Sequence, residues 1–596
     1  MKNLKVLVIA MFLFNIAIAQ TYTALKVTEI MYNAPDYNGI AGASLDFLEL
    51  KNTATGTIDL SGFYFADGIT YTFPAGSSIN AGAFIVLAAD TTAFKQKYPG
   101  VSFFDQYIDT LSSKGERIRL AAPAPIDTFI SITYNDDLPW PILADGNDYS
   151  LVPIDNNPTN NQKDAEDWRA SAIQCGSPGV DDGTPPVFPE IIVTEVLSHT
   201  DPPEYDAVEI FNASVSAVDI SGWFISDNRN DPMRYIIPQG TIINAGEYLV
   251  FDEFDFNADT NGFVFNRTGD HALLFSANAD SVLTGYAAGY EFGAQYNGVS
   301  FGRWVNSLGD VHFVAQPQTS LGMANDSPKV GPVVVTHINY KPLSGTPPAP
   351  SHEEYLVLQN ITDTVVNLFY EHWDGTFTDT VWQVKGIGFE FPENVSLQPK
   401  EYVILTDTTP TYFRSENAIP NFIKVYQYPG SLSNKSDNIR VMAPERRDTL
   451  PSGVIYTPYV LIDQVDYKDT IPWPIYADEG AGYRLDRIVD NHYGNDPANW
   501  GESSGGLFNF LPLSINDLHH ATDVLVYPNP TSEVLNFNGA KELVSIKLYS
   551  VDGRLILQTF PGDLKASISV ATLSSGVYFY QVNLENRQIT GKVIIE

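Results

Sequence analysis

Apolar and polar residues alternate along one stretch of the chain, and that stretch occurs more than once. Residues 46–67 recur without a gap as residues 206–227, and a divergent third copy begins at Glu354. Leu48 and Glu49 of the first copy point to opposite sides if the segment is extended, a period of two that is typical of a half-buried strand. Repetition on this scale predicts tandem copies of one small β domain.

Each copy is framed by two further predicted strands. A strand precedes each copy, with the sequences VTEI at 27–30, VTEV at 193–196 and VTHI at 335–338. Another strand follows each copy after a short turn, at 79–88, 243–252 and 397–406. The abundance of Tyr, Phe, Val and Thr also favours strands. We therefore predict an all-β chain with three tandem units, at residues 25–178, 191–325 and 332–504.

The order of these motifs resembles that of the lamin tail domain. The shared pattern is a VTE strand, a second strand that contains Glu49 or Glu209, a turn with Ser-Gly and an aromatic residue, and a strand entered through Ala-Gly. The resemblance implies an immunoglobulin-like β-sandwich for each unit, of a kind found in secreted, multi-domain surface proteins of bacteria. The third copy is the divergent one, because Val357 replaces the glutamate and Phe369 and Tyr370 replace Ser-Gly.

Two segments have the composition of linkers. Residues 176–190, with the sequence GSPGVDDGTPPVFPE, separate the first two units, and residues 505–522 precede the last part of the chain. Clusters of Pro, Gly and Asp rarely continue a strand, and few contacts are expected to cross them. We therefore expect the units to fold independently and proteases to cut first within these two segments.

The last part of the chain, residues 523–596, has strand alternation but none of the upstream motifs. A proline-bounded turn, a hairpin turn and a closing aromatic strand form its own motif, with Tyr527, Pro528, Asn529, Pro530, Asp552, Gly553, Arg554, Gly576 and Tyr578. This combination resembles the type A C-terminal sorting domain of the type IX secretion system of the Bacteroidetes, a small β-sandwich. The resemblance implies that the type IX secretion machinery is a partner and that the protein is secreted or displayed on the outer-membrane surface.

The first 19 residues have the features of a secretory signal peptide. Lys2 and Lys5 give a charged start, an apolar run follows, and small residues lead to a cleavage site between Ala19 and Gln20. We therefore expect the chain to enter the periplasm and to begin at Gln20 after cleavage. No later stretch has the length of a transmembrane helix, so we expect no transmembrane span.

The composition narrows the range of partners. The chain has 71 acidic and 34 basic residues, which gives a formal net charge of −37. A surface of this charge repels phosphate groups, so we predict that nucleic acid is not a partner. Cys175 is the only cysteine of the chain, so no intrachain disulfide can form, and we expect Cys175 to be an unpaired structural residue.

The sequence contains none of the short motifs that mark common nucleophile, phosphate and zinc sites. The Asp-rich turn at 227–231 could donate oxygens to calcium. It lacks EF-hand spacing, however, and Asp and Asn are ordinary turn residues. We therefore predict that the protein is not an enzyme and has no cofactor, catalytic residue or metal ligand.

The tryptophans give a hint of a ligand. Position-matched tryptophans favour a role in the fold, and they form the pairs Trp140 with Trp473 and Trp168 with Trp500. Trp373 and Trp382 have no counterpart in the other copies and flank a polar loop. They are therefore our candidate ligand contacts, since an exposed indole ring offers a flat apolar face to a sugar.

Two classes of function remain after these arguments. In the first, the protein is a non-enzymatic secreted or cell-surface protein whose tandem sandwiches bind an unknown surface ligand, either a glycan or a protein. In the second, it is an accessory or targeting module of an extracellular hydrolase, such as a nuclease or phosphatase, or a carbohydrate-binding surface protein. We favour the first class, because the four modules fill the sequence and leave no room for a separate catalytic domain.

Overall fold

The computed structural model describes residues 23–123, 128–159, 162–258, 262–342, 354–371, 377–449, 453–475, 477, 483–504, 524–527, 531–550, 554–584 and 587–595. The chain divides into two compact units. The first comprises residues up to Asp407 together with Tyr428–Glu502, and the second comprises Thr408–Gln427 and Ser503–Glu596. Within the described ranges, no helix is long and apolar enough to cross a membrane.

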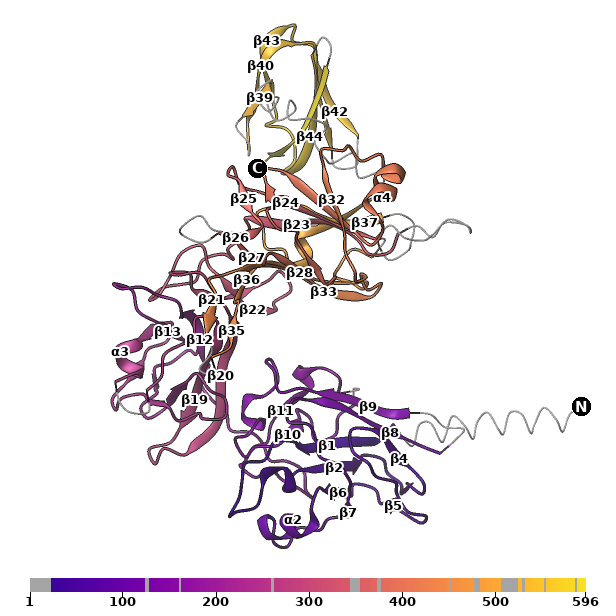
Figure 1. The fold of residues 1–596 in the computed structure, drawn as a ribbon, viewed down its shortest axis with the longest axis vertical. Coiled ribbons are helices and arrows are strands. Elements are labelled where there is room, and N and C mark those ends of the chain that lie inside the picture. Colours follow the sequence, from indigo (N-terminus) through magenta and orange to yellow (C-terminus); the bar gives the residue numbers. More distant parts are fainter. Residues whose placement is uncertain are drawn as a thin grey trace, which may run out of the picture. The chain divides into compact units, whose positions relative to one another are not determined.

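The first sandwich packs two sheets face to face (Figure 1). The larger sheet has the order β11-β10-β1-β2-β6-β7, with β1 (Leu25–Met31), β2 (Phe47–Asn52), β6 (Phe84–Ala88), β7 (Asp105–Gln106), β10 (Leu151–Pro153) and β11 (Trp168–Ala170). The facing sheet has the order β4-β8-β9, with β4 (Tyr64–Asp67), β8 (Glu116–Ala121) and β9 (Thr128–Tyr134). Strands β3 (Ile58–Asp59) and β5 (Ser78–Ile79) form a separate ladder. Helix α2 (Thr91–Lys97) begins after Asp90, whose carboxylate accepts hydrogen bonds from two amides of the first turn.

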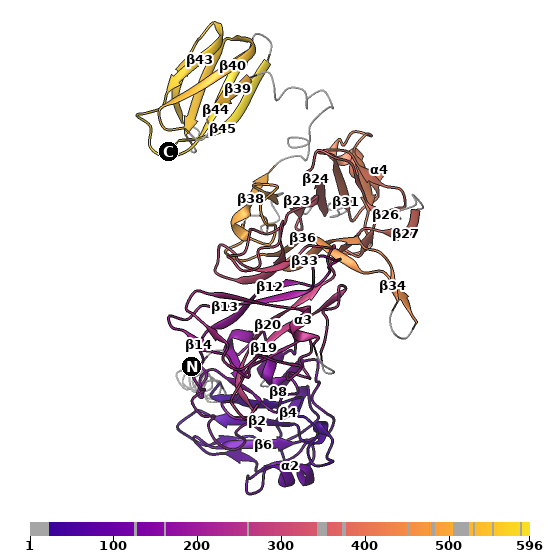
Figure 2. The ribbon, with the colours of Figure 1, turned by 90° about the vertical axis from the view of Figure 1, so that its left-hand side faces the viewer.

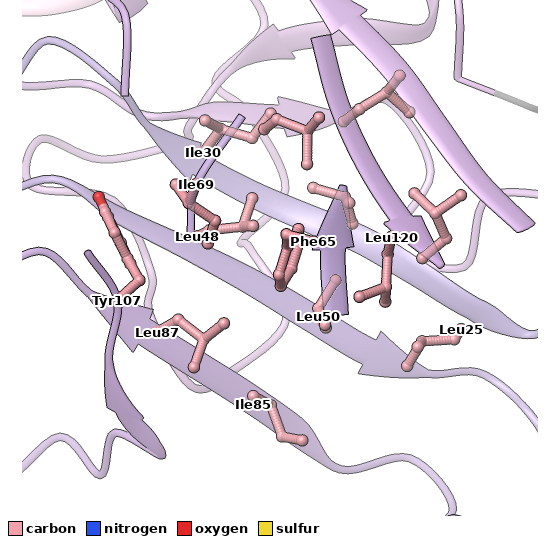
Figure 3. Close-up of a cluster of buried hydrophobic side chains, with 14 of the residues drawn as sticks. Leu25, Ile30, Leu48, Leu50, Phe65, Ile69, Ile85, Leu87, Tyr107 and Leu120 are labelled. Atoms are coloured by element: carbon pink, nitrogen blue, oxygen red, sulfur yellow. The ribbon is translucent and has the colours of Figure 1, made fainter. Parts of the chain in front are cut away.

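Figure 3 shows the core between these two sheets. Leu48 and Leu50 of β2 are fully buried and pack in one cluster with Phe65 and Leu120 of the facing sheet. The burial of these two leucines confirms the predicted inward positions of β2. Complete burial of one leucine side chain stabilises the fold by roughly 2 kcal/mol. The predicted solvated face is wrong, because Glu49 on the opposite side of β2 is only 1% exposed.

The second sandwich has the same construction. Its larger sheet has the order β18-β13-β12-β21-β22, with β12 (Ile191–Leu197), β13 (Ala207–Asn212), β18 (Tyr248–Asp252), β21 (Phe301–Val305) and β22 (Val311–Ala315). The facing sheet has the order β16-β15-β19-β20, with β15 (Phe224–Ser226), β16 (Tyr235–Ile236), β19 (Gly269–Ala277) and β20 (Leu283–Gly293). A ladder of β14 (Val218–Asp219) and β17 (Ile242–Ile243) and a short helix, α3 (Glu253–Phe256), complete it.

The third sandwich repeats this strand order. Its larger sheet includes the run β31-β24-β23-β37-β38, with β23 (Val333–Asn339), β24 (Tyr355–Asn360), β31 (Tyr402–Thr406), β37 (Tyr483–Arg487) and β38 (Trp500–Ser504). The facing sheet has the order β29-β28-β33-β36, with β28 (Gln383–Lys385), β29 (Phe389–Glu390), β33 (Ser436–Pro444) and β36 (Tyr459–Lys468). Small ladders pair β25 (Val366–Asn367) with β30 (Ser396–Leu397), β26 (Phe369–Glu371) with β27 (Phe377–Val381), and β34 (Asp448–Thr449) with β35 (Ile455–Tyr456).

One irregularity recurs in all three sandwiches. The first strand changes register against its partner at the same place in each copy, between Val27 and Glu29, between Val193 and Glu195, and between Val335 and His337. A bulge inserts one unpaired residue and bends the strand. Because the strand order and the bulge both recur, the third sandwich keeps the architecture of the first two although its sequence diverges.

The second compact unit contains helix α4 (Pro410–Asn417), strand β32 (Lys424–Gln427) and a C-terminal sandwich. Figure 2 shows the two sheets of this sandwich, with the orders β39-β40-β43 and β42-β41-β44-β45. Their strands are β39 (Val524–Tyr527), β40 (Val534–Leu543), β41 (Ser545–Ser550), β42 (Leu555–Thr559), β43 (Asp563–Ser569), β44 (Gly576–Leu584) and β45 (Arg587–Ile595). Its core gathers buried residues such as Leu535, Ile546 and Val582. The structure thus has the small β-sandwich that the sequence predicts for residues 523–596.

Candidate functional site

Two buried glutamates hold the closing segment of the first sandwich. The amide of Ser177 donates to Oε1 of Glu29 over 2.8 Å, and the amide of Gly179 donates to Oε2 of Glu49 over 2.6 Å. Gly176 is pressed against the same carboxylate, because an added Cβ would lie 2.1 Å from Oε1 of Glu29. We refer to this arrangement as the Ser-x-Gly clasp. It explains why Glu49 is buried, since the closing segment covers the polar side of β2.

The clasp moves the end of the first sandwich beyond the predicted boundary at residue 178. Lys51 of β2 forms an ion pair with Asp181, and Arg169 of β11 forms one with Asp182 over 2.6 Å. Asp182 is buried. The predicted linker at 176–190 is therefore too long, because residues 176–182 belong to the sandwich.

The second sandwich has the same clasp. The amide of Ser320 donates to Oε1 of Glu195 over 2.9 Å, and the amide of Gly322 donates to Oε2 of Glu209. Burial raises the pKa of Glu209 to about 7. In the first sandwich, burial raises the pKa of Glu29 to about 7, and burial followed by the charge of Glu29 raises the pKa of Glu49 well above its usual value. These carboxyls lie within the fold, so we assign them a structural role.

The third sandwich replaces the clasp by a buried ion pair. The guanidinium of Arg487 donates to Asp463 over 2.7 Å. The same two side chains bind the backbone at the bulge, since Arg487 donates to the carbonyl of Val335 and Asp463 accepts from its amide. His337 and Val357, which stand where the other copies have glutamate, are both buried. The divergence of the third copy is therefore a change in how its bulge is held.

A packed contact joins the first and second sandwiches. Arg229, which follows β15, donates to the carbonyl of Asp136 over 2.6 Å, and its guanidinium lies 3.6 Å from carboxylate oxygens of Asp136 and Asp145. An apolar cluster also spans both sandwiches, with Leu143, Tyr149, Phe224, Leu273, Phe275, Ala277 and Leu283. The two sandwiches are thus connected by a buried interface as well as by a linker, contrary to the expectation of a loose joint.

A second junction joins the second and third sandwiches. The end of β20 lies against β36, where Ala294 and Val460 form an isolated β-bridge. The amide of Ser307 donates to Asp496 over 3.0 Å. The hydroxyl of Tyr493 lies 3.2 Å from Nδ1 of His312, and the two rings meet edge to face. These contacts hold the hairpin of β21 and β22 against the segment that follows β37.

A groove of about 540 Å³ opens at this second junction. Trp304 and Ile488 supply apolar lining, and the polar lining includes Ser327, Asn491 and His492. These three polar residues are exposed to solvent. The volume lies within the range of about 300–1,000 Å³ that is common for small-molecule sites. A concave surface with an aromatic wall and a few uncharged polar groups can bind a ligand, and we take this groove as the candidate functional site.

Trp304 is not among the ligand contacts predicted from the sequence. The register of the sheets aligns it with Ile154 and Ile488, because Leu151, Phe301 and Leu485 face equivalent residues of the first strand in each copy. Trp304 thus has no tryptophan counterpart, which was the criterion that selected Trp373 and Trp382. An alignment of the paired strands would have singled out Trp304, because it places this tryptophan at a position where the other two copies have isoleucines, Ile154 and Ile488, that are more than half exposed.

The ring nitrogens distinguish Trp304 from the position-matched tryptophans. Nε1 of Trp168 donates to the carbonyl of Gln162 over 3.2 Å, and Nε1 of Trp500 donates to the carbonyl of Gly494 over 2.7 Å. Both tryptophans are buried and serve the fold, as predicted. Nε1 of Trp304 is also buried but has no acceptor among the described residues. A buried indole N–H usually finds a partner, so the fold does not account for Trp304 in the same way.

Of the two predicted ligand contacts, Trp382 is not among the lining residues of this groove. Trp373 lies outside the described residues. Trp382 lies between β27 and β28 and is 5% exposed, so its ring has no free face on which a ligand could stack. We therefore do not retain Trp382 as a ligand contact.

The other predicted site residues occupy the two ends of the chain. Ala19, Gln20, Pro528, Asn529, Pro530, Asp552 and Gly553 lie outside the described residues. Tyr527 ends β39, Arg554 directly precedes β42, and Gly576 and Tyr578 lie at the start of β44. The amide of Ser550 donates to the carbonyl of Arg554 over 3.0 Å, which closes the predicted hairpin.

The remaining candidates for chemistry have structural partners. Cys175 donates its thiol to Oδ2 of Asp148 over 3.1 Å, and burial together with this hydrogen bond raises the pKa of the thiol to about 11. A thiol with a raised pKa is a poor nucleophile. In the part of the chain that the structure describes, no three or more His, Cys, Asp or Glu residues are grouped so that they could hold a metal ion.

Family comparisons identify three segments. Residues 19–130 and 184–288 match the family model of the Lamin Tail Domain, and residues 525–596 match that of the secretion system C-terminal sorting domain. Both resemblances seen in the sequence are confirmed for these segments. The Lamin Tail Domain matches do not include the third sandwich. Among curated proteins, none matches the chain significantly.

Comparisons with solved structures give distant alignments. PorZ, a surface component of the type IX secretion system of Porphyromonas gingivalis, aligns at 10% identity over 96% of this chain and 100% of its own, with a TM-score of 0.12. The BSP domain of a biofilm-associated protein aligns at 7% identity over 96% of each chain, with a TM-score of 0.14. The major pilin subunit BcpA of Bacillus cereus aligns at 11% identity over 68% of this chain and 96% of its own, with a TM-score of 0.09. These scores are too low to indicate a shared function.

Proposed function

Because this chain carries lamin tail domains at 19–130 and 184–288 and a secretion system sorting domain at 525–596, we propose that it is a non-enzymatic surface protein that binds a ligand through its tandem sandwiches. The sorting domain marks the chain as a secreted or cell-surface protein and implies contact with the type IX secretion machinery. The sandwiches are then the exported cargo, and the binding function belongs to them.

The groove beside Trp304 is the observation that carries this proposal. It lies where two sandwiches meet, and hydrogen bonds from Ser307 to Asp496 and between Tyr493 and His312 brace the junction. A braced junction keeps the groove in shape before a ligand arrives, which lowers the entropic cost of binding. The third sandwich contributes Ile488, Asn491 and His492 to the groove. The groove therefore requires two adjacent sandwiches.

We also propose that the third sandwich is a divergent lamin tail domain. Its strand order and the register shift between Val335 and His337 support this assignment. Its buried pair of Arg487 and Asp463 binds the backbone at this bulge, while His337 and Val357 stand at the positions of the glutamates, which accounts for the loss of the family pattern in its sequence.

Deletion of residues 523–596 should leave the remaining chain in the periplasm. The C-terminal sandwich has a core of its own around Leu535 and Val582, so its removal should leave the upstream sandwiches folded. Fractionation of cells with type IX secretion, followed by protease shaving, would locate both forms. Residues 507–596 fused behind a signal peptide and a fluorescent protein should carry that cargo outside such cells, but not outside cells that lack the system. Efficient surface display of the deleted form would contradict the proposal.

Adhesion of the displaying cells tests the binding role. Cells that display the full chain should attach to ligand-bearing surfaces more strongly than cells with the deleted form. Equal attachment of the two strains, when only the full chain is displayed, would show that the sandwiches do not bind.

A further inference from the structure

We propose that the groove between the second and third sandwiches binds a neutral carbohydrate, with Trp304 as the ring on which a sugar packs. This inference rests on the proposed binding function and names its ligand class. Trp304 of the second sandwich and Ile488 of the third both line the groove. A sugar ring has a face made of C–H groups, and such a face packs favourably on an indole ring.

The polar groups of the groove suit sugar hydroxyls. Asn491 offers an amide that both donates and accepts, Ser327 offers a hydroxyl, and His492 offers an imidazole. All three residues are exposed at the groove, so their side chains can reach a ligand without the opening of the fold. Sugar hydroxyls also act as both donors and acceptors, and a small set of such groups fixes the orientation of a ligand in a concave site.

The charges of the groove favour a neutral ligand. Asp496 is the only acidic residue among the lining residues that the structure describes, and its carboxylate accepts hydrogen bonds from the amide and hydroxyl of Ser307. The described lining residues include no lysine or arginine, and the whole chain carries a formal charge of −37. A sulfated or uronic-acid sugar would therefore meet repulsion without a cation to offset it.

A peptide is the less favoured occupant. Peptides that bind to β proteins commonly add a strand to an exposed sheet edge, where backbone groups supply the hydrogen bonds. The lining of this groove instead consists of an aromatic ring, aliphatic side chains and polar side chains, which come from β21, the segment before β23 and the segment after β37. The chemistry of the lining thus matches a sugar better than an extended backbone.

Calorimetric titration of the exported chain tests the proposal. The probes are the β-linked hexaoses of glucose, mannose, xylose and N-acetylglucosamine, which are neutral and differ in ring substituents. We expect at least one of them to bind with an affinity in the micromolar to millimolar range, and Trp304→Ala to weaken that binding at least tenfold. Asn491→Ala should weaken it by a smaller factor, because other polar groups remain at the rim.

Ile154→Ala is the matched control, since Ile154 occupies the equivalent position in the first sandwich and is also exposed. Its binding should equal that of the unaltered chain. Trp304→Phe keeps an aromatic ring and should retain part of the affinity, and thermal melting would confirm that each variant is folded. Binding of none of the four probes, or equal binding by folded Trp304→Ala, would overturn the proposal. A displayed chain that promotes adhesion equally well with Trp304→Ala would overturn this site and leave the surface-binding function standing.

Discussion

Replacement of Arg229 by alanine should lower the free energy of unfolding of the joined first and second sandwiches by about 3–5 kcal/mol. Arg229 is 9% exposed and lies beside two buried carboxylates, those of Asp136 and Asp145. Removal of the guanidinium would leave both carboxylates buried with less compensation of their charge, and Oδ2 of Asp145 already has no hydrogen-bond partner among the described residues. Burial, followed by the charge of Arg229, lowers the pKa of His271, whose ring lies beside the same guanidinium.

Calorimetry of the intact chain would measure this effect. We expect one cooperative transition for the two sandwiches in the unaltered chain, and a lower, split transition for the variant. Arg234→Ala is the matched control, because the partners of Arg234 among the described residues, Asp227, Gly262 and Phe263, all belong to the second sandwich. Protease cuts at 184–190 should also become faster in Arg229→Ala alone. An unchanged transition in that variant would mean that the buried interface does not couple the two sandwiches.

The first sandwich should lose stability as the pH rises from about 5 to 8. Burial raises the pKa of Glu29 from 4.5 to about 7, so the folded state holds a proton that the unfolded state releases. The stabilising contribution is therefore complete below about pH 4.5 and is lost as the pH rises through about 7. For Glu29 alone it is on the order of 3 kcal/mol. Glu49, whose pKa is raised mainly by burial, acts in the same direction.

Glu29→Gln should remove most of this dependence, because a glutamine stays neutral at every pH. Relative to the unaltered chain, the variant should be more stable at pH 8 and no more stable at pH 5. Hydrogen exchange of the β1 and β2 amides, corrected for the intrinsic effect of pH, would report the stability of this sandwich within the intact chain. Glu190→Gln is the control for net charge, since Glu190 is exposed. The same response in both variants would attribute the dependence to the overall charge of −37 instead.

The strand pattern predicted which side chains of β2 enter the core but not what covers its other side. Leu48 and Leu50 alternate with Glu49, and a period of two assigns them to opposite faces of the strand. It does not say whether the second face is exposed to solvent or covered by another part of the chain. The covering residues, Ser177 and Gly179, lie 130 or more positions further along the chain. A contact at that separation has no signature in local periodicity. The segment that forms the clasp is rich in Pro and Gly, and this composition led to the prediction of a linker at 176–190.

The candidate groove could not be predicted from the sequence for a similar reason. Trp304 belongs to a β strand of the second sandwich, whereas Asn491 and His492 belong to a loop of the third. Their proximity follows from the way the sandwiches meet, which the sequence of either copy does not encode. The lack of a tryptophan counterpart was visible in the sequence, but it became usable only after the paired strands aligned Trp304 with Ile154 and Ile488.

The Ser-x-Gly clasp also bears on when the first sandwich can become stable. Ser177 binds a glutamate that lies 148 positions earlier in the chain. A chain that emerges from the ribosome, or crosses a membrane, with its N-terminus leading keeps Glu29 and Glu49 hydrated until residue 179 has followed. Contacts between distant residues form slowly because a long loop must close first. The arrival of the last residues, and not the pairing of the first strands, therefore sets the time at which this part of the chain resists unfolding and proteolysis.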